Sequence, residues 1–256
     1  MFVIGVIPAR MASSRYPGKP LVPILGQPMI YHVWRRVLLS GACDKVVVAT
    51  CDEEIVQAAQ SFGAETIMTS ANHLGANDRV AEVANLLECD AVVNIQGDEP
   101  LVHPQLVTDV VHVFRTRPDV QCVNPVARIS TETELVSRNT VKAVQNLAGR
   151  IIYFSRAVIP SATKNDLAHP VMRQVPIIGL RADFAIRLAG LTPGPLELLE
   201  GIDLLRAIEH DLPIHALETE FQTFGVDTTQ DHEVVETKLQ SDPIYPLYAD
   251  ETLTSS

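Results

Sequence analysis

The stretch FVIGVIPARMASSRYPGKPL, residues 2–21, joins an apolar run to a basic loop of small residues. Residues 2–8 are apolar at nearly every position, which is typical of a parallel strand covered by helices on both faces. The loop that follows carries three cationic side chains, Arg10, Arg15 and Lys19. Because ligands of α/β proteins bind beyond the carboxyl ends of parallel strands, we expect this loop to bind an anion. The alternative is a solvated basic loop.

Strand and helix patterns alternate through the first half of the chain. Short apolar runs predict further strands at 45–50, 65–70, 91–97 and 120–129. Apolar residues spaced by three and four predict helices at 28–41, 52–63, 77–88 and 103–116. This alternation predicts an α/β fold with a mostly parallel, doubly wound sheet and right-handed crossovers.

The second half has a less regular pattern. We expect strands at 141–146, 150–160, 175–184 and 213–220, and one long helix at 195–211. Residues 1–240 are predicted to form a single domain with a small elaboration after about residue 130. Residues 241–256 contain turn residues without a period and are predicted to be mobile.

The composition limits the class of protein. The chain has 256 residues and a formal net charge of -11, which argues against a nucleic-acid duplex as partner. No apolar run approaches the length that spans a bilayer, and the first residues lack the basic region of a signal peptide. The four cysteines form no CxxC pair, so we expect buried thiols in a cytoplasmic protein.

Two acidic segments point to a metal. Asp98 and Glu99 follow the strand predicted at 91–97, and Asp227 precedes a helix start. Two carboxylates, with phosphate oxygens and water, commonly hold Mg²⁺, so Asp98 and Asp227 are candidate metal ligands. The alternative is that Asp98, Glu99 or Asp227 only caps a helix. Combined with the basic loop, the acids predict phosphoryl or nucleotidyl transfer.

Five motifs together give a more specific indication. They are IPARMASSRYPGKPL, QGDEP, YFSRAVIP, PLELLE and GVDTTQD. In order and spacing they resemble the 3-deoxy-manno-octulosonate (Kdo) cytidylyltransferases, over roughly residues 2–238. The resemblance implies a nucleotide-diphosphosugar-transferase-like three-layer fold and a homodimer. It also implies that a hydroxyl of a sugar acid attacks the α-phosphorus of CTP and releases pyrophosphate.

The resemblance assigns roles to individual residues. It implies catalytic roles for Lys19, Asp98 and Asp227, with Asp98 and Asp227 holding Mg²⁺. It implies nucleotide binding by Arg10, Arg15, Lys19, Asn77 and Arg79. It implies acceptor binding by Gln96, Arg156, Gln174, Glu197 and Glu200. It places the nucleotide in residues 1–130, and the acceptor and the dimer contact in 131–240. For Glu197 and Glu200 a solvated acidic helix face is the alternative, and Asn77 could instead cap a helix.

Two departures from the family pattern lie near the substrates. The chain has HLGANDR where a Ser-Gly-Thr-Asp/Glu-Arg run is usual, and RQVPIIGLR in place of a stretch similar to RHLGIYGYR. The second change replaces polar side chains by Gln174, Ile178 and Leu180, which predicts an altered acceptor pocket. The leading hypothesis is CTP transfer to a Kdo-type acid. Transfer to another acid or a phosphonate, and a non-catalytic nucleotide-binding module, are the alternatives; a dehydrogenase is disfavoured because GxGxxG is absent.

Overall fold

The computed structural model describes residues 1–12, 16–73, 75–161 and 171–249. The first half contains β1 (Val3–Pro8), the 3-10 helix η1 (Lys19–Leu21), β2 (Pro23–Ile24), β3 (Gln27–Pro28), α1 (Met29–Leu39), β4 (Lys45–Thr50), α2 (Glu53–Ser61), β5 (Glu65–Met68), α3 (Ala76–Leu86), β6 (Ala91–Ile95), α4 (Pro104–Thr116) and β7 (Cys122–Arg128). The second half contains α5 (Glu132–Val136), β8 (Lys142–Gln145), β9 (Arg150–Ser155), β10 (Met172–Gln174), β11 (Ile177–Arg181), α6 (Ala182–Ala189), α7 (Pro195–Glu200), α8 (Leu205–Glu209), β12 (Ile214–Thr219), α9 (Thr229–Gln240) and the 3-10 helix η2 (Tyr245–Leu247).

One sheet runs through both halves of the chain. Its strand order over the described residues is β10-β8-β9-β12-β7-β11-β6-β1-β4-β5. Strands β1, β4 to β8 and β12 point one way, and β9, β10 and β11 point the other way. The predicted α/β fold with a mostly parallel sheet is confirmed. The division near residue 130 into nucleotide and acceptor halves stays a prediction.

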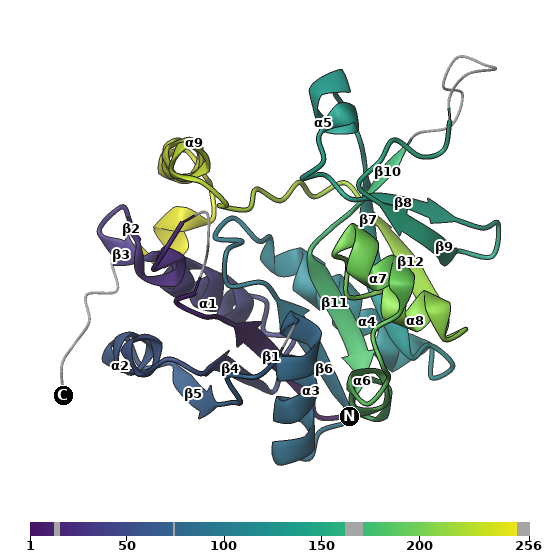
Figure 1. Cartoon of the computed structure of the whole chain (residues 1–256). Helices are drawn as coiled ribbons and strands as arrows, with labels where there is room; N and C mark the ends of the chain where they lie inside the picture. Colours follow the sequence, from purple (N-terminus) through teal and green to yellow (C-terminus); the bar gives the residue numbers. More distant parts are fainter. Residues whose placement is uncertain (13–15, 74, 162–170, 250–256) are drawn as a thin grey trace.

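The first strand shows why the fold has three layers. Along β1, Val3 and Ile7 pack into one apolar core, whereas Ile4 and Val6 pack into another. Successive side chains of a strand point to opposite faces, so β1 is buried on both sides. Helices α1 and α4 contribute to the first core and α3 and α6 to the second, as their positions on opposite faces of the sheet in Figure 1 show. The sheet is therefore the middle layer.

The second half corrects two predicted elements. The strand expected at 175–184 ends at Arg181, and the chain continues as α6, with Ala182, Phe184 and Ala185 buried on one side. The helix expected at 195–211 is two short helices, α7 and α8. Gly201 separates them with a φ of 63°, a left-handed conformation that glycine adopts without strain.

The segment after α9 also differs from its prediction. Residues 241–256 were expected to be mobile, but the Tyr248 side chain is 1% exposed and packs beneath α1. Nη2 of the buried Arg36 lies 2.7 Å from Oδ1 of Asp242, so an ion pair also holds the segment. Aromatic residues drive this packing although they follow no helical or strand period; residues 250–256 lie outside the described part. No helix within that part is long and apolar enough to cross a bilayer.

Candidate active site

Residues from distant parts of the sequence line one cavity of about 550 Å³. It lies where the neighbouring parallel strands β1 and β6 end, which is the position expected for a ligand in this class of sheet. The predicted site residues that line it are Arg10, Lys19, Asn77, Arg79, Gln96, Asp98, Arg156, Gln174 and Asp227. Arg15 lies outside the described residues.

Lys19, Asp98 and Asp227 lie together at one end of the cavity, the charged end. Nζ of Lys19 lies 2.5 Å from Oδ2 of Asp98 and 3.2 Å from Oδ1 of Asp227. Burial alone lowers the pKa of Lys19, but the charges and hydrogen bonds of the two aspartates outweigh it and raise that pKa above its ordinary value. Lys19 is therefore a cation at neutral pH, and Asp98 and Asp227 converge on one cation position.

The backbone brings these three side chains together. Gly18, with a φ of 70°, precedes η1 and turns Lys19 back toward β6. A Cβ at Gly97 would lie 2.9 Å from the carbonyl oxygen of Pro8, so glycine permits the close approach of the β1 and β6 ends. The backbone N–H of Val226 donates to the carbonyl oxygen of Asp98 at 3.0 Å, and this bond places Asp227 beside Asp98.

The capping alternatives for the two aspartates are wrong. Helix α4 begins after His103, and α9 is capped by Thr228 with Asp231. The carboxylate of Asp231 accepts hydrogen bonds from the N–H groups of Asp227 and Thr228. Asp98 and Asp227 therefore do not cap these helices, and their side chains face the cavity.

Glu99, for which the sequence predicts only a capping role, is buried next to the two aspartates. It is 6% exposed, and its Oε2 has no hydrogen-bond partner among the residues that the structure describes. Burial first, and the charge of Asp98 second, raise the pKa of Glu99 well above its ordinary value. Burial and the neighbouring Asp98 carboxylate thus both disfavour the charged form of Glu99 at this end of the cavity.

Asn77 and Arg79 form another part of the cavity wall at the start of α3. The Oδ1 of Asn77 accepts a hydrogen bond from Nδ2 of the buried Asn94 at 2.8 Å. Asn77 does not cap the helix, because Gly75 is the capping position and its N–H donates to Asp78. The guanidinium of Arg79 is buried and donates to Thr69 and Cys51.

Gln96, Gln174 and Arg156 surround the remaining part of the cavity. Nε of Arg156 donates to the carbonyl oxygen of Glu200 at 2.8 Å, and its Nη1 donates to the carbonyl oxygen of Arg138 at 2.9 Å. These backbone contacts hold the guanidinium at the cavity wall. Gln96 and Gln174 bring side-chain amides to the same region, which is therefore the amide-lined end of the cavity.

Glu197 and Glu200 lie elsewhere than predicted. Neither lines the cavity. Glu197 is buried, and both of its carboxylate oxygens accept hydrogen bonds from Arg206. The oxygens of Glu200 accept from Oγ of Ser155 at 2.6 Å and from the N–H of Arg156 at 2.9 Å. Both carboxylates form hydrogen bonds within the protein. They therefore have neither of the two roles expected from the sequence, which were acceptor binding and a solvated acidic helix face.

A comparison with protein-family models decides the family. The model described as "Cytidylyltransferase" matches residues 4–214, most of the chain. The chain belongs to the cytidylyltransferase family. It is 41% identical over 233 residues to a 3-deoxy-manno-octulosonate cytidylyltransferase of Solibacter usitatus, covering 91% of this chain and 92% of the relative. It is 38% identical over 243 residues to the Zea mays enzyme of that name, covering 93% and 81%.

Solved structures agree with this assignment. A CMP:2-keto-3-deoxy-manno-octonic acid synthetase complexed with CTP matches with a TM-score of 0.89 and 35% identity, covering 94% of this chain and 99% of that one. A putative glucose-1-phosphate thymidylyltransferase of Bacillus anthracis shares the fold, with a TM-score of 0.67 at 18% identity. This chain is thus an enzyme of the nucleotidyltransferase class, a cytidylyltransferase.

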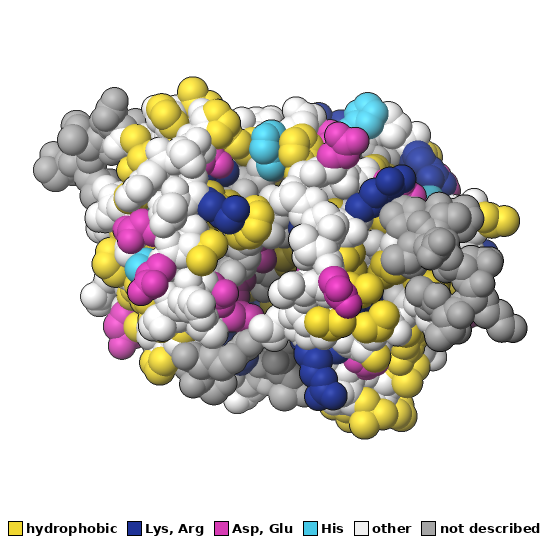
Figure 2. Space-filling model, turned by 90° about the horizontal axis from the view of Figure 1, so that it is seen from above, with side chains coloured by type: hydrophobic (Ala, Val, Ile, Leu, Met, Phe, Trp, Pro, Cys, Tyr) yellow, Lys and Arg dark blue, Asp and Glu magenta, His cyan; other side chains and the backbone are white. Residues whose placement is uncertain are grey.

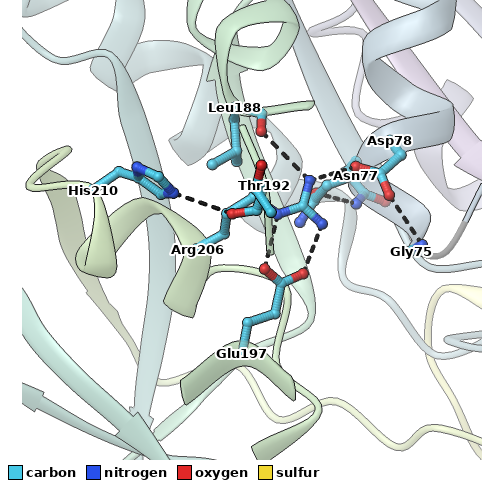
Figure 3. Close-up of polar contacts among 9 residues, drawn as sticks. Gly75, Asn77, Asp78, Leu188, Thr192, Glu197, Arg206 and His210 are labelled. Carbon is cyan, nitrogen blue, oxygen red and sulfur yellow. Dashed lines mark hydrogen bonds and ion pairs between the residues drawn. The ribbon is translucent and has the colours of Figure 1, made fainter. Parts of the chain in front are cut away.

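Within this cytidylyltransferase, a buried cation joins the elements around the amide-lined part of the cavity (Figure 3). Arg206 in α8 is 4% exposed, binds Glu197 of α7 at 2.6 and 2.8 Å, and binds Asp78 of α3 at 2.8 Å. The hydrogen bonds that Arg206 donates to Glu197 are the largest effect on the pKa of Arg206, and they raise it. Arg206 therefore joins α7 and α8 to the first turn of α3, which carries Asn77.

The sequence interpretation missed Arg206 and the neighbouring Asp203. Asp203 lines the cavity and packs so close to Gly75 that a side chain at residue 75 would collide with its carboxylate. Burial is the main effect on the pKa of Asp203 and raises it. In the predicted long helix Asp203 and Arg206 resemble ordinary surface charges, and only the break at Gly201 turns them inward.

Proposed function

We propose that this cytidylyltransferase couples CTP to a 2-keto-3-deoxy sugar acid such as Kdo, in the presence of Mg²⁺, and yields a CMP-sugar and pyrophosphate. The observation that carries the proposal is the cation position shared by Asp98 and Asp227, at one end of a cavity that Arg156 and two glutamines line at the other. The printed names of the relatives support CTP as the nucleotide and Kdo as the acid.

The acidic pair fits a magnesium ion. The Lys19 ammonium shows that Asp98 and Asp227 can share one cation. Within the described ranges no group of three His, Cys, Asp or Glu side chains could hold a metal ion, so phosphate oxygens and water would complete the shell. When bound, Mg²⁺ neutralises the triphosphate and lowers the pKa of the attacking hydroxyl.

The remaining residues bind and orient the substrates. Arg10 and Lys19 are cations that bind the triphosphate, and Arg156 pairs with the carboxylate of the acid. The acceptor hydroxyl forms a bond to the α-phosphorus while the bond to the bridging oxygen breaks. Pyrophosphate leaves, and the hydroxyl proton passes to solvent.

A homodimer belongs to this proposal. The side chains of Ile152 in β9 and of Leu198 and Leu199 in α7 are 51%, 70% and 83% exposed. The bond between Ser155 and Glu200 holds these two elements side by side. Exposed apolar side chains on neighbouring elements favour a protein contact. We expect sedimentation equilibrium to give a dimer that Leu199→Lys weakens; a monomer in the wild type would contradict this part.

A second acceptor class remains an alternative because of two apolar side chains. Ile178 and Leu204 line the cavity, where they offer no hydrogen bonds to sugar hydroxyls. They favour an acid with fewer hydroxyls, or a phosphonate, as acceptor of the same CTP transfer.

Pyrophosphate release tests the proposal. The purified enzyme is mixed with CTP and MgCl₂ and with Kdo, 8-amino-Kdo, a sialic acid or a small phosphonate. We expect release with Kdo that disappears when EDTA removes the metal. Release only with another acid would contradict Kdo as the acceptor, and CTP binding without turnover on any acid would favour the non-catalytic module.

Figure 2 shows the Lys and Arg side chains of the upper face dispersed among acidic and hydrophobic side chains.

A further inference from the structure

A buried asparagine lies beneath the amide-lined part of the cavity. Asn124 is in β7, in the middle of the sheet, and is 0% exposed. A buried amide is costly unless its polar atoms form hydrogen bonds. Its Nδ2 donates to the carbonyl oxygens of Val175 and Ile177, at 2.9 and 2.8 Å. Asn124 therefore holds the corner between β10 and β11, around Pro176.

These two bonds fix the orientation of the Asn124 amide. If the amide were turned over, its oxygen would face two carbonyl oxygens, and no proton would lie between them. The Oδ1 of Asn124 must therefore be the atom that lies 3.1 Å from the Gln174 side chain. An oxygen there can only accept, so Gln174 donates through Nε2.

The orientation of Gln174 follows from that of Asn124. With Nε2 turned toward Asn124, the Oε1 of Gln174 is the end left for a ligand in the cavity that this side chain lines. Gln96 differs, because among the described residues the side chain of its partner Asn94 hydrogen-bonds only to the amides of Asn77 and Gln96, and these three amides could turn over together. Of these two glutamines, the fold fixes the polarity of Gln174.

We infer that Gln174 accepts a hydrogen bond from a hydroxyl or ammonium group of the acceptor substrate, and that Asn124 is a positioning residue that holds Gln174 in this polarity. The inference rests on the proposed function, since it takes the cavity to bind the acceptor. Val141, Pro176 and Ile178 also line this part of the cavity, and their side chains offer no hydrogen-bond donor to Oε1 of Gln174. A donor on the substrate is therefore required at this point, because its loss leaves Oε1 without a partner.

The first test removes the Gln174 amide. We expect Gln174→Met to raise KM for Kdo about tenfold with KM for CTP unchanged, since one hydrogen bond is lost on the acceptor side. Gln57→Met, at an exposed position of α2, is the matched control. If the wild type turns over Kdo and Gln174→Met behaves like this control, the inference is wrong while the proposed function stands. If the wild type releases no pyrophosphate with Kdo, the proposed function itself fails for this acid.

Substrate analogues test the direction of the bond. Kdo analogues with one hydroxyl at a time replaced by hydrogen or by fluorine are compared on the wild type and Gln174→Met. Neither hydrogen nor fluorine at that position can donate a hydrogen bond. At one position of Kdo, both analogues should therefore have a KM about tenfold higher than that of Kdo on the wild type, with no further rise on Gln174→Met. If the fluorine analogues bind as well as Kdo at every position, Gln174 does not accept from a substrate hydroxyl.

The role of Asn124 is tested by non-additivity. Asn124→Leu should raise KM for Kdo about as much as Gln174→Met does. The double variant should have a KM for Kdo no higher than that of either single variant. An additive loss, or an equal rise in KM for CTP, would show a general structural role. Asn124→Ser, which keeps one donor, should restore part of the affinity for Kdo. If Asn124→Leu does not fold, Asn124→Ser and the analogue series still decide the inference.

Discussion

The two ends of the cavity are built in different ways. At the charged end, Lys19 of η1 directly contacts Asp98, which follows β6, and Asp227, which precedes α9. At the amide-lined end, Gln174 takes its orientation from Asn124, a buried residue outside the cavity lining. Binding groups at one end are thus visible as local motifs, whereas those at the other end depend on residues beneath them. Substitutions at the two ends should have different consequences.

The largest effect is expected at the charged end. Asp98→Asn removes one of the two carboxylates proposed to hold the metal, and we expect pyrophosphate release to fall about a thousandfold, equivalent to about 4 kcal/mol. The free energy of unfolding should change by no more than about 1 kcal/mol, since the Asp98 side chain is 33% exposed. Glu233→Gln on α9 is the control. Full activity of Asp98→Asn would remove this residue from the metal site.

Arg206 provides the opposite case. Arg206→Met leaves Glu197 and Asp78 without their buried cation, so we expect a loss of about 3 kcal/mol in the free energy of unfolding. Urea denaturation measures this loss, with Arg187→Met on the exposed face of α6 as control. Equal stability of the two variants would show that Arg206 does not hold the amide-lined end together.

The stability measurements should be made at neutral pH, because the buried His32 makes the free energy of unfolding fall at acid pH. Burial lowers the pKa of His32 to about 4, from 6.5 in an unfolded chain. Its stabilising contribution is complete above pH 6.5 and is lost as the pH falls toward 4, since the unfolded chain binds the proton more readily. Between pH 7.5 and 5 the loss is about 2 kcal/mol. His32→Gln should show a smaller loss in urea denaturation than the wild type or His112→Gln; an equal loss would contradict the buried neutral state.

The smallest effect tests the turn at the amide-lined end. Gly201 has a φ of 63°, where an alanine is strained, so we expect Gly201→Ala to cost about 1 kcal/mol in the free energy of unfolding. It should raise KM for the acceptor more than KM for CTP, because Gly201 lines the cavity beside Arg156. A larger rise for CTP would place the turn at the nucleotide.

The sequence predicts the charged end well for a physical reason. A buried apolar run followed by Gln96, Gly97 and Asp98 marks the end of a strand, and ends of parallel strands meet at one edge of the sheet. The fold class follows from the same alternation. These signals are local, so neighbouring residues are enough to recognise them.

At the amide-lined end Gln96, Arg156 and Gln174 are predicted from the sequence and line the cavity, but the positions of Glu197 and Glu200 could not be predicted in the same way. The period of 195–211 is that of one helix, and Gly201 alone does not show that the chain turns there. Once it turns, Glu197 meets Arg206 and Glu200 meets Ser155, instead of the cavity. The packing of Tyr248 beneath α1 also depends on contacts between residues distant in the sequence. No pattern within a short window contains such contacts.

A crystal structure with CTP and Mn²⁺ would test the central claim most directly, since anomalous scattering locates the metal independently of the protein. We predict a metal peak in contact with both Asp98 and Asp227, with the Lys19 ammonium moved from between them onto a phosphate. A metal bound elsewhere, with Lys19 still paired to both aspartates and the triphosphate outside the cavity, would contradict the assignment of this end as the nucleotidyl-transfer site.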